Sequence, residues 1–314
     1  MTFETTSSVA AVVVVFDPDE RFRRLIPLVI GQIQKLWVID NGSDDLNKNY
    51  INSLIAQYKD RINVIQNDQN RGLASAQNQG IREALKSGCG WVLLLDQDSL
   101  PEANMVHTML QAVHEHKADE IVGLITPRHE NDNGEASVPT YAEGKWLRFR
   151  RYFMKKSDID DSLAFAMASG SMVPARIFHE IGFMKEEFWI DYIDYNFSFR
   201  VKKAGYKILG VGAAGLSHRL GETHQVTVCG KIINYQAHSA RRRYTIYRNR
   251  VNVIREFGLH FPSFIVFELF SISKDLAKLL LIEQNKIQKL KAIWLGLIHG
   301  LIKRQRFDFL DKMR

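Results

Sequence analysis

Short apolar runs alternate with helix-spaced segments along the first half of this 314-residue chain. Five runs have the length and composition of a strand: 10–16, 36–40, 61–66, 91–95 and 121–126. Three segments between them carry apolar side chains at helical spacing: 20–34, where Pro27 is expected to delay or kink the helix, 73–86 and 102–117. Such alternation predicts the α/β fold class, with an open, mostly parallel sheet covered by helices on both faces.

The second half has fewer strand signals. Residues 128–165 are polar and irregular, which is typical of a long functional or mobile loop. Further elements are expected at 168–174, 175–181, 191–204 and 207–211, followed by three helices at about 240–257, 262–283 and 286–305. We therefore expect an α/β domain over residues 1–239 and a basic amphipathic helical extension over residues 240–314.

Composition excludes several other classes of protein. Apolar residues make up 46% of the chain and charged residues 25%, which rules out a disordered, collagen-like or disulfide-rich miniprotein. Cys89 and Cys229 share no metal or redox spacing, so a reducing compartment is expected. The N-terminus does not have the pattern of a signal peptide, and no run reaches the ~18 uncharged apolar residues of a membrane span. These features predict a cytoplasmic protein.

Positive charge is concentrated at the C-terminal end. The net charge is +7, yet residues 240–255 alone carry six arginines and no acid, and residues 286–314 are also strongly basic. The rest of the chain is therefore net acidic. A basic end on an acidic body predicts an anionic partner for that end: a membrane surface, a nucleic acid or a diphosphate.

Carboxylates follow several of the expected strands. Asp17, Asp40 and the segment Asp96-Gln97-Asp98 each lie at a strand's carboxyl end, where open α/β sheets bind ligands. Asp96 and Asp98 are two residues apart, so in an extended segment both side chains face one way and can share a hard cation such as Mg²⁺. The alternative is that these acids only end the strand and cap the helix that starts near Pro101.

Four segments in this order resemble the nucleotide-sugar-binding half of family 2 glycosyltransferases. They are VVVVFDP at 12–18, VIDNGSDD at 38–45, NRGLASAQNQG at 70–80 and DQDS at 96–99. Phe16 and Asp17 stand where Tyr and Asn are more usual in that family. The resemblance extends over about residues 8–255. It implies an inverting enzyme with a GT-A fold, whose donor half spans about residues 1–127 and whose acceptor half spans about residues 165–239.

The resemblance also implies residue roles. It places Asp40 on the nucleobase or ribose, Arg71 beside the base, Asp96 near the ribose and Asp98 on a Mg²⁺ or Mn²⁺ ion beneath the diphosphate. The complete implied nucleotide-sugar set is Phe16, Asp17, Asp40, Asn41, Arg71, Gly72, Asp96, Gln97, Asp98 and Arg248; the metal set is Asp96, Asp98 and His218. For Gly72, close packing of the helix on the sheet is the alternative to ligand contact.

The acceptor side is implied by a second group of residues. An inverting transfer needs one base to take the acceptor's hydroxyl proton. In the family this base lies six residues before an arginine; counting back from Arg200 gives Asp194, although Ile193 and Asn196 depart from the family pattern. Asp191, one helical turn earlier, is the second candidate. Either acid could instead only cap the helix. The residues implied for acceptor contact are Ser169, Gly170 and Trp189.

The amino-acid sequences of these motifs are most similar to those of bacterial rhamnosyltransferases in this family. That similarity implies dTDP-L-rhamnose as donor and a lipid-linked saccharide or growing surface polysaccharide, such as O-antigen, as acceptor. An apolar stripe from Ile287 to Leu301, flanked by lysines and arginines, fits a helix on the anionic cytoplasmic face of a bacterial inner membrane or a helix packed on the domain.

Three alternatives follow from other features. The first is a glycosyltransferase that uses another donor, such as a UDP-sugar. The second is a nucleotidyltransferase, which is disfavoured because residues 16–19 are acidic rather than glycine-rich. The third is a nucleic-acid-binding protein that uses the Arg/Tyr-rich helix at 241–250. The acidic body opposes it, so no nucleic-acid partner is expected.

Overall fold

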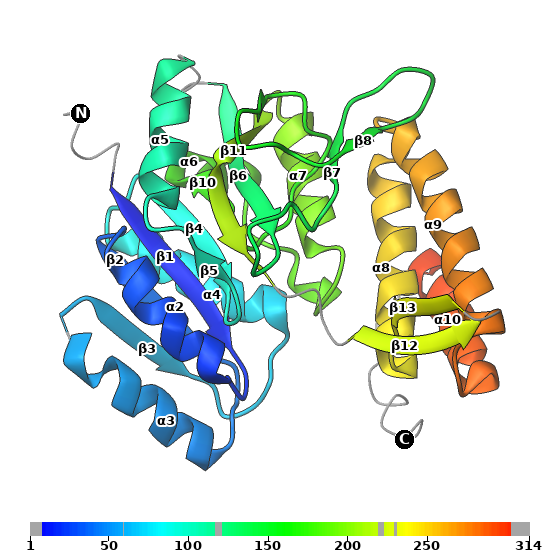
Figure 1. Ribbon diagram of the computed structural model, residues 1–314, viewed down its shortest axis with the longest axis horizontal. Helices are drawn as coiled ribbons and strands as arrows, with labels where there is room; N and C mark the ends of the chain where they lie inside the picture. The colour runs from blue at the N-terminus through cyan, green and yellow to red at the C-terminus, as the bar shows by residue number, and fades with distance from the viewer. Residues whose placement is uncertain (1–7, 59, 117–120, 219–222, 229–230, 303–314) are drawn as a thin grey trace. The chain divides into compact units, whose positions relative to one another are not determined.

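The computed structural model describes residues 8–58, 60–116, 121–218, 223–228 and 231–302 (Figure 1). The chain divides into two compact units. Unit 1 comprises residues 1–143, 150–189 and 193–219, and unit 2 comprises residues 144–149, 190–192 and 220–314. Each unit is described by itself.

Unit 1 is built on a sheet of nine strands in its described part, in the order β3-β2-β1-β4-β10-β6-β11-β5, with β9 paired to β11. The first four are β3 (Ile62–Gln66), β2 (Lys35–Asp40), β1 (Val9–Val15) and β4 (Trp91–Asp96), all parallel to one another. The others are β10 (Met172–Pro174), β6 (Val122–Glu130), β11 (Lys207–Ser217), β5 (Leu100–Pro101) and β9 (Ile159–Asp160). Strand β10 runs antiparallel to both neighbours, whereas β11 is parallel to β6. The sheet is thus mixed but mostly parallel.

Helices cover both faces of this sheet. The buried residues of β1 alternate between the faces: Val13 packs in one core with the helices α2 (Glu20–Ile30) and α5 (Met105–Glu115). Val12 faces α4 (Leu73–Lys86) so closely that a Cβ on Gly80 would lie 2.3 Å from its Cγ1. The expected α/β class, with helices on both faces and further helices at the C-terminal end, is therefore confirmed.

The remaining elements of unit 1 complete this frame. Its helices are α3 (Asp45–Ile55), the 3₁₀ turn η1 (Ala56–Tyr58), α6 (Ala175–Ile181), the 3₁₀ turn η2 (Glu186–Phe188) and α7 (Ile193–Lys203). A short antiparallel pair is formed by β7 (Thr140–Ala142) and β8 (Arg150–Tyr152). Most expected elements agree with the structure to within a few residues, although α2 contains Pro27 and ends at Ile30.

The segment 128–165 is more ordered than its polarity predicts. Strand β6 continues through Glu130, and β7, β8 and β9 all lie within the segment. The charges that suggested a loop neutralise each other inside the strand, since buried Arg128 and Glu130 form an ion pair of 2.5 Å. The expectation that the whole segment is irregular was wrong, because an ion pair within one strand cannot be distinguished by composition from a solvated surface.

Unit 2 contains three helices and a hairpin. The helices are α8 (Ala240–Phe257), α9 (Pro262–Leu281) and α10 (Lys286–Leu301), and the hairpin pairs β12 (Thr223–Val228) with β13 (Lys231–Gln236). Helix α10 approaches α8 through its small residues: a Cβ on Gly296 would lie 2.6 Å from the Tyr244 carbonyl oxygen. Across the described residues, every helix is either too short or too polar to pass through a bilayer. The basic residues after Ile302 lie outside the described part of the chain.

Candidate functional site

The polar residues that follow β1, β2 and β4 lie at one edge of the sheet. The Phe16 amide donates to Gln97 Oε1 at 2.8 Å, and Gln97 Nε2 donates back to the Phe16 carbonyl oxygen at 3.2 Å. The Asp17 amide donates to Ser43 Oγ at 3.0 Å, and Asp17 adopts a positive φ of 44°. The parallel order of the three strands therefore brings together residues that are about 80 positions apart in the sequence.

Asp40 is fully buried at this edge. Its Oδ1 accepts a hydrogen bond from the Ser43 amide at 2.9 Å. Within the described residues, its buried Oδ2 has no hydrogen-bond partner. A buried carboxylate oxygen without a donor is costly, so this atom fits a donor group on a ligand.

A network of asparagines shapes the turn before α4. Asn41 Nδ2 donates to Asn70 Oδ1 at 3.1 Å, and Asn41 Oδ1 accepts from the Arg71 amide at 3.0 Å. Gly72 follows with a φ of 85°, and a Cβ there would lie 2.9 Å from Trp189 Cδ2. Glycine is therefore needed at this position both for the backbone conformation and for the approach of the indole. The Arg71 side chain is exposed.

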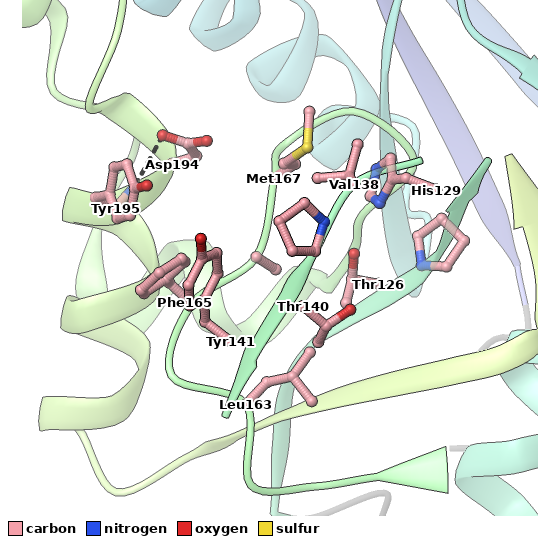
Figure 2. Close-up of a pocket in the computed structure, with 13 residues that line it drawn as sticks. Thr126, His129, Val138, Thr140, Tyr141, Leu163, Phe165, Met167, Asp194 and Tyr195 are labelled. Atoms are coloured by element: carbon pink, nitrogen blue, oxygen red, sulfur yellow. Dashed lines mark hydrogen bonds between the residues drawn. The ribbon is translucent and has the colours of Figure 1, made fainter. Parts of the chain in front are cut away.

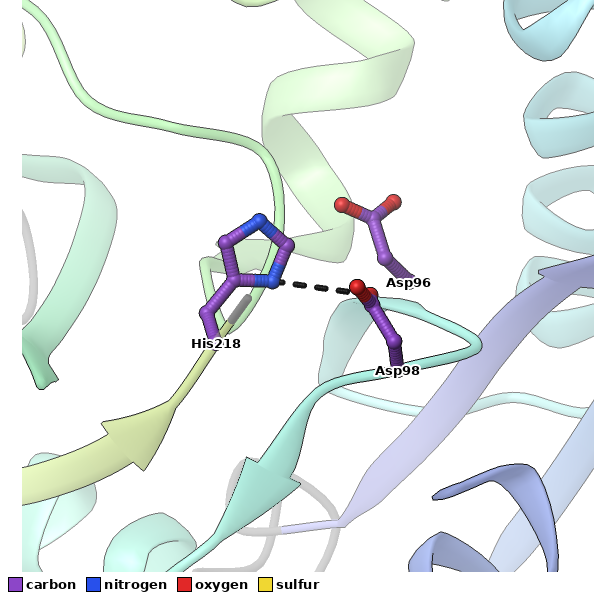
Figure 3. A group of neighbouring side chains, drawn as sticks. All are labelled: Asp96, Asp98 and His218. Atoms are coloured by element: carbon purple, nitrogen blue, oxygen red, sulfur yellow. Dashed lines mark ion pairs between the residues drawn. The ribbon is translucent and has the colours of Figure 1, made fainter. Parts of the chain in front are cut away.

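Asp96, Asp98 and His218 form a candidate metal site (Figure 3). Each offers one ligand atom, these atoms lie within 4.8 Å of one another, and all three residues are partly buried. His218 Nδ1 lies 3.6 Å from Asp98 Oδ1. Burial raises the pKa of Asp96, and the Asp98 charge raises it further, while His218 opposes both. Two carboxylates and an imidazole are a donor set that fits Mg²⁺ or Mn²⁺.

Two serines hold this group together. Ser99 Oγ lies 2.6 Å from Ser169 Oγ and 3.0 Å from His218 Nδ1. Ser169 Oγ also accepts from the Asp96 amide at 3.1 Å. Ser169, predicted to contact the acceptor, therefore supports the metal group through its hydroxyl.

Arg21 is a further supporting residue, which the sequence analysis missed. Its side chain is buried, its Nε donates to the Asp98 carbonyl oxygen at 2.7 Å, and its Nη1 pairs with Asp132 at 2.9 Å. The only signal was an arginine beside Phe22 on the apolar face of a helix. Such a position indicates a buried partner, but it does not say which one.

The two candidate bases lie in different units and in different surroundings. Asp194 is in the first turn of α7 in unit 1, where its Oδ1 accepts from the Tyr195 amide at 2.9 Å and its side chain lines a cavity (Figure 2). Asp191 belongs to unit 2 and accepts hydrogen bonds from Arg242 Nε at 3.1 Å and Arg242 Nη2 at 2.9 Å. This bidentate pair engages both carboxylate oxygens of Asp191.

The remaining predicted residues are placed as follows. Gly170 has a φ of 81°, and a Cβ there would lie 2.6 Å from Leu216 Cδ2, so it permits a tight approach of two chain segments. The Trp189 carbonyl accepts from the Leu73 amide at 2.7 Å at the start of α4. The close approach explains glycine at position 170, whereas the Trp189 contact is made by its backbone. Contact of either residue with an acceptor stays a prediction.

Half of the six arginines of α8 are buried within unit 2: Arg243, Arg248 and Arg250 are buried, and Arg241, Arg242 and Arg255 are exposed. Arg248 is 2% exposed, and its Nε and Nη2 lie 3.1 and 2.8 Å from Asn249 Oδ1. Arg243 is fully buried against Asp275 and Glu283, both at 2.7 Å. The buried arginines contact their own unit and are not presented to a nucleic acid, and of the exposed ones Arg242 pairs with Asp191 and Arg255 bonds the Gly300 carbonyl oxygen. These contacts do not favour that alternative. Nucleotide contact by Arg248 stays a prediction.

Comparison with known proteins gives a family. The glycosyl transferase family 2 pattern matches residues 11–182. The chain is 25% identical over 313 residues to the dTDP-rhamnosyl transferase RfbF of Shigella flexneri, which covers 94% of this chain and 96% of the relative. It is 24% identical over 156 residues to the glycosyltransferase GlyG of Streptococcus pneumoniae, about half of each chain.

Solved structures with the same fold are more distant in sequence. Staphylococcus aureus TarS 1-349 in complex with UDP-GlcNAc matches with a TM-score of 0.62 at 14% identity, covering 93% of this chain and 81% of that one. GalNAc-T7 with UDP, GalNAc and Mn²⁺ matches with a TM-score of 0.61 at 14% identity, covering 94% and 56%. At such identities the likeness shows the fold.

Proposed function

This chain belongs to glycosyl transferase family 2, and we propose that it transfers L-rhamnose from dTDP-L-rhamnose to a saccharide acceptor with inversion at the anomeric carbon. The observation that carries the proposal is the group Asp96, Asp98 and His218 at the carboxyl edge of the sheet. The choice of donor is supported by the similarity to a dTDP-rhamnosyl transferase along nearly the whole chain.

In this proposal the sheet edge binds the donor. Asp98, Asp96 and His218 hold Mg²⁺ or Mn²⁺, which when bound would supply Lewis-acid stabilisation of the leaving diphosphate. Asp40 accepts a hydrogen bond from the nucleoside through its buried Oδ2, and the turn at Asn41 and Arg71 borders the base. Phe16 and Gln97 connect these positions across the edge through their hydrogen bonds to each other, and Asp17 does so through its hydrogen bond to Ser43.

Asp194 acts as the base on the acceptor. It takes the proton of the attacking hydroxyl while the new bond from that oxygen to the anomeric carbon forms. The bond from the anomeric carbon to the phosphate oxygen breaks, and its electron pair leaves with the nucleoside diphosphate. Asp194 is favoured over Asp191 because it lines a cavity, whereas Arg242 holds Asp191 as an ion pair.

Calorimetric titration with dTDP, UDP, GDP and ADP, each with and without Mn²⁺, tests this function. We expect Mn²⁺-dependent binding with a preference for dTDP. A clear preference for UDP would contradict rhamnose as the transferred sugar and leave the family intact. The absence of binding by any nucleotide to folded protein would contradict the donor site at the sheet edge.

We also propose that unit 2 attaches the enzyme to the cytoplasmic face of a membrane that carries a lipid-linked acceptor. Helices α9 and α10 leave large apolar side chains exposed, including Leu281 (81%), Ile287 (74%) and Trp294 (65%). Lys286 and Lys291 are exposed on α10 between them. Exposed apolar side chains with flanking lysines favour anionic lipid surfaces. In this proposal residues 1–239 form the catalytic domain, and residues 240–314 form the membrane-associating extension.

Vesicle binding tests the membrane proposal. Trp294 fluorescence should shift to shorter wavelength, and the protein should co-sediment, with phosphatidylglycerol vesicles but not with phosphatidylcholine vesicles. Ile287→Glu should weaken both effects, and Leu46→Glu, a change at an exposed position of unit 1, should not. Equal binding to both lipids, or to neither, would contradict an anionic membrane partner.

A further inference from the structure

A cavity of about 170 Å³ lies in unit 1 beside Asp194 (Figure 2). Its walls come from β6, β7, the segment 163–167 and the first turn of α7. None of the residues predicted for acceptor contact (Ser169, Gly170 and Trp189) is among those that line it. A cavity of ~150 Å³ accommodates one six-membered ring such as benzene, so this one has room for a single ring.

One wall of the cavity is aromatic. The Phe165 ring lies between two tyrosines, with centroid distances of 5.3 Å to Tyr141 and 4.6 Å to Tyr195. The three rings come from separate chain segments, and all three line the cavity. The C–H face of a pyranose ring packs well on aromatic rings.

The opposite wall carries polar groups without a positive charge. Thr126 is 4% exposed, and within the described residues its Oγ1 has no hydrogen-bond partner. His129 Nε2 donates to the Ser169 carbonyl oxygen at 2.9 Å. No lysine or arginine occurs among the described lining residues. The wall thus suits a neutral ligand rich in hydroxyl groups.

Ser169 connects the cavity to the candidate metal site. Ser169 contacts the cavity residue His129 through its carbonyl oxygen and contacts the Asp96 amide through its hydroxyl. The rings of His129 and His218 are 6.4 Å apart. A ligand in the cavity would therefore lie between the candidate base and the residues expected to hold the diphosphate.

We propose that this cavity is the acceptor subsite and binds one neutral pyranose residue. The ring stacks on Tyr141, Phe165 and Tyr195, one hydroxyl bonds Thr126 Oγ1, and the attacking hydroxyl faces Asp194. This inference rests on the proposed function and adds the substrate class and the residues that select it: uncharged pyranoses are accepted and uronic acids are rejected, because Asp194 repels a second carboxylate.

Nuclear magnetic resonance of ¹³C-methyl methionine tests the subsite directly, because Met167 lines the cavity. The probes are the methyl glycosides of rhamnose, glucose, galactose and N-acetylglucosamine at millimolar concentration, with methyl glucuronide and cyclohexanol for comparison. We expect at least one neutral glycoside to shift the Met167 signal more strongly than either comparison compound. Equal shifts with cyclohexanol, or no shift with any glycoside, would overturn the proposal.

Two cavity variants and one control sharpen the test. Thr126→Val removes a hydroxyl for which the described residues offer no hydrogen-bond partner. The variant protein should therefore bind the glycoside about three- to tenfold more weakly without losing stability. Thr245→Val is the matched control, since the buried Thr245 hydroxyl bonds the Arg241 carbonyl oxygen in unit 2. It should lose stability and keep glycoside binding. Tyr195→Leu should weaken binding about tenfold through loss of the aromatic wall.

Nucleotide titration of the same proteins separates the two proposals. Both cavity variants should keep Mn²⁺-dependent dTDP binding, because Thr126 and Tyr195 lie outside the donor site. If dTDP binds and the glycosides do not, the subsite is refuted and the proposed function stands. If a glycoside binds in the cavity and no nucleotide binds, the proposed donor chemistry fails while the saccharide subsite remains.

Discussion

The acids of unit 2 and the acids at the carboxyl edge of the sheet in unit 1 have different partners. In unit 2 the acids are matched by cations: Glu268 lies 2.6 Å from Arg250, and Glu283 lies 2.7 Å from Arg243 and 2.8 Å from Lys289. In unit 1 Asp96 and Asp98 share their surroundings with His218 alone, and within the described residues no lysine or arginine pairs with their carboxylates. Arg21 reaches the Asp98 carbonyl oxygen instead.

This difference distinguishes acids that stabilise the fold from acids that are candidates for binding a ligand. A carboxylate that already has its cation serves the fold, because removing the partner would leave a buried charge. Two neighbouring carboxylates without one are costly to the fold, and we propose that a metal cation compensates Asp96 and Asp98. The candidate bases differ in another respect: Asp194 lines a cavity, and Asp191 is bound by Arg242.

The largest expected effect is at Asp194. Replacing it in Asp194→Asn removes the proton acceptor and should lower kcat by about 10²–10⁴-fold. Mn²⁺-dependent dTDP affinity, measured by calorimetry, should be nearly unchanged, because the cavity and the donor edge use different residues. Asp191→Asn is the control and should retain most activity. The reverse order of the two variants would make Asp191 the base and break the rule that paired acids are structural.

The next effect tests the paired acids of unit 2. Arg250→Met leaves buried Glu268 without its cation and should lower the free energy of unfolding by about 3–5 kcal/mol in urea denaturation. The double variant Arg250→Met/Glu268→Leu removes the stranded charge and should recover most of that loss. If the double variant is no more stable than the single one, the cost comes from lost packing of Arg250 on Tyr247, whose ring centroid is 4.5 Å away, and not from charge.

The fold follows from the sequence where the signal is local. The helix at 73–86 and the strand ending at Asp96 have apolar patterns that a single segment can express. Helix α3 and the hairpin of β12 and β13 were missed. Although α3 contains five apolar residues, it fully buries only Ile51, so its apolar face is weak. The order β4-β10-β6 also could not be predicted, since the three-residue β10 is defined by its neighbours rather than by its own pattern.

The site was predictable to the same extent. Asp96, Asp98 and His218 were predicted together, and the structure brings them within 4.8 Å. The identity of the supporting residues was not accessible, because Ser99 and Ser169 are 70 positions apart and meet only across the sheet. Thr126 gave no signal at all, since a threonine in a strand becomes notable only when its hydroxyl is found buried without a partner.

The third prediction concerns the loss of stability at low pH that the buried, uncharged His129 of unit 1 should cause. Unit 1 buries His129 uncharged, with a pKa lowered to about 4 by burial, whereas an unfolded histidine titrates near ~6.5. Between these two pKa values the unfolded chain binds more protons than the folded chain does. The contribution of neutral His129 to the free energy of unfolding is therefore fully present above the unfolded pKa and is lost as the pH falls towards 4, by about 3 kcal/mol in total. Urea denaturation from pH 4.5 to 7.5 should show that His129→Gln has a shallower pH dependence. Parallel curves for the two proteins would mean that His129 is not buried in solution.

The smallest expected change in stability is that of Asp98→Asn, and it can be compared directly with a matched variant in unit 2. In EDTA, Asp98→Asn should leave the melting temperature unchanged or slightly raised, because it relieves repulsion with Asp96. The same variant should lose the Mn²⁺-induced rise in melting temperature and bind dTDP with Mn²⁺ at least ~10-fold more weakly. Asp275→Asn in unit 2 is the matched control: it loses the pairs with Arg243 and Lys278, so it should melt lower with and without Mn²⁺. If Asp98→Asn behaves like Asp275→Asn, the acids at the sheet edge are structural, and the distinction between compensated and uncompensated carboxylates does not identify the site.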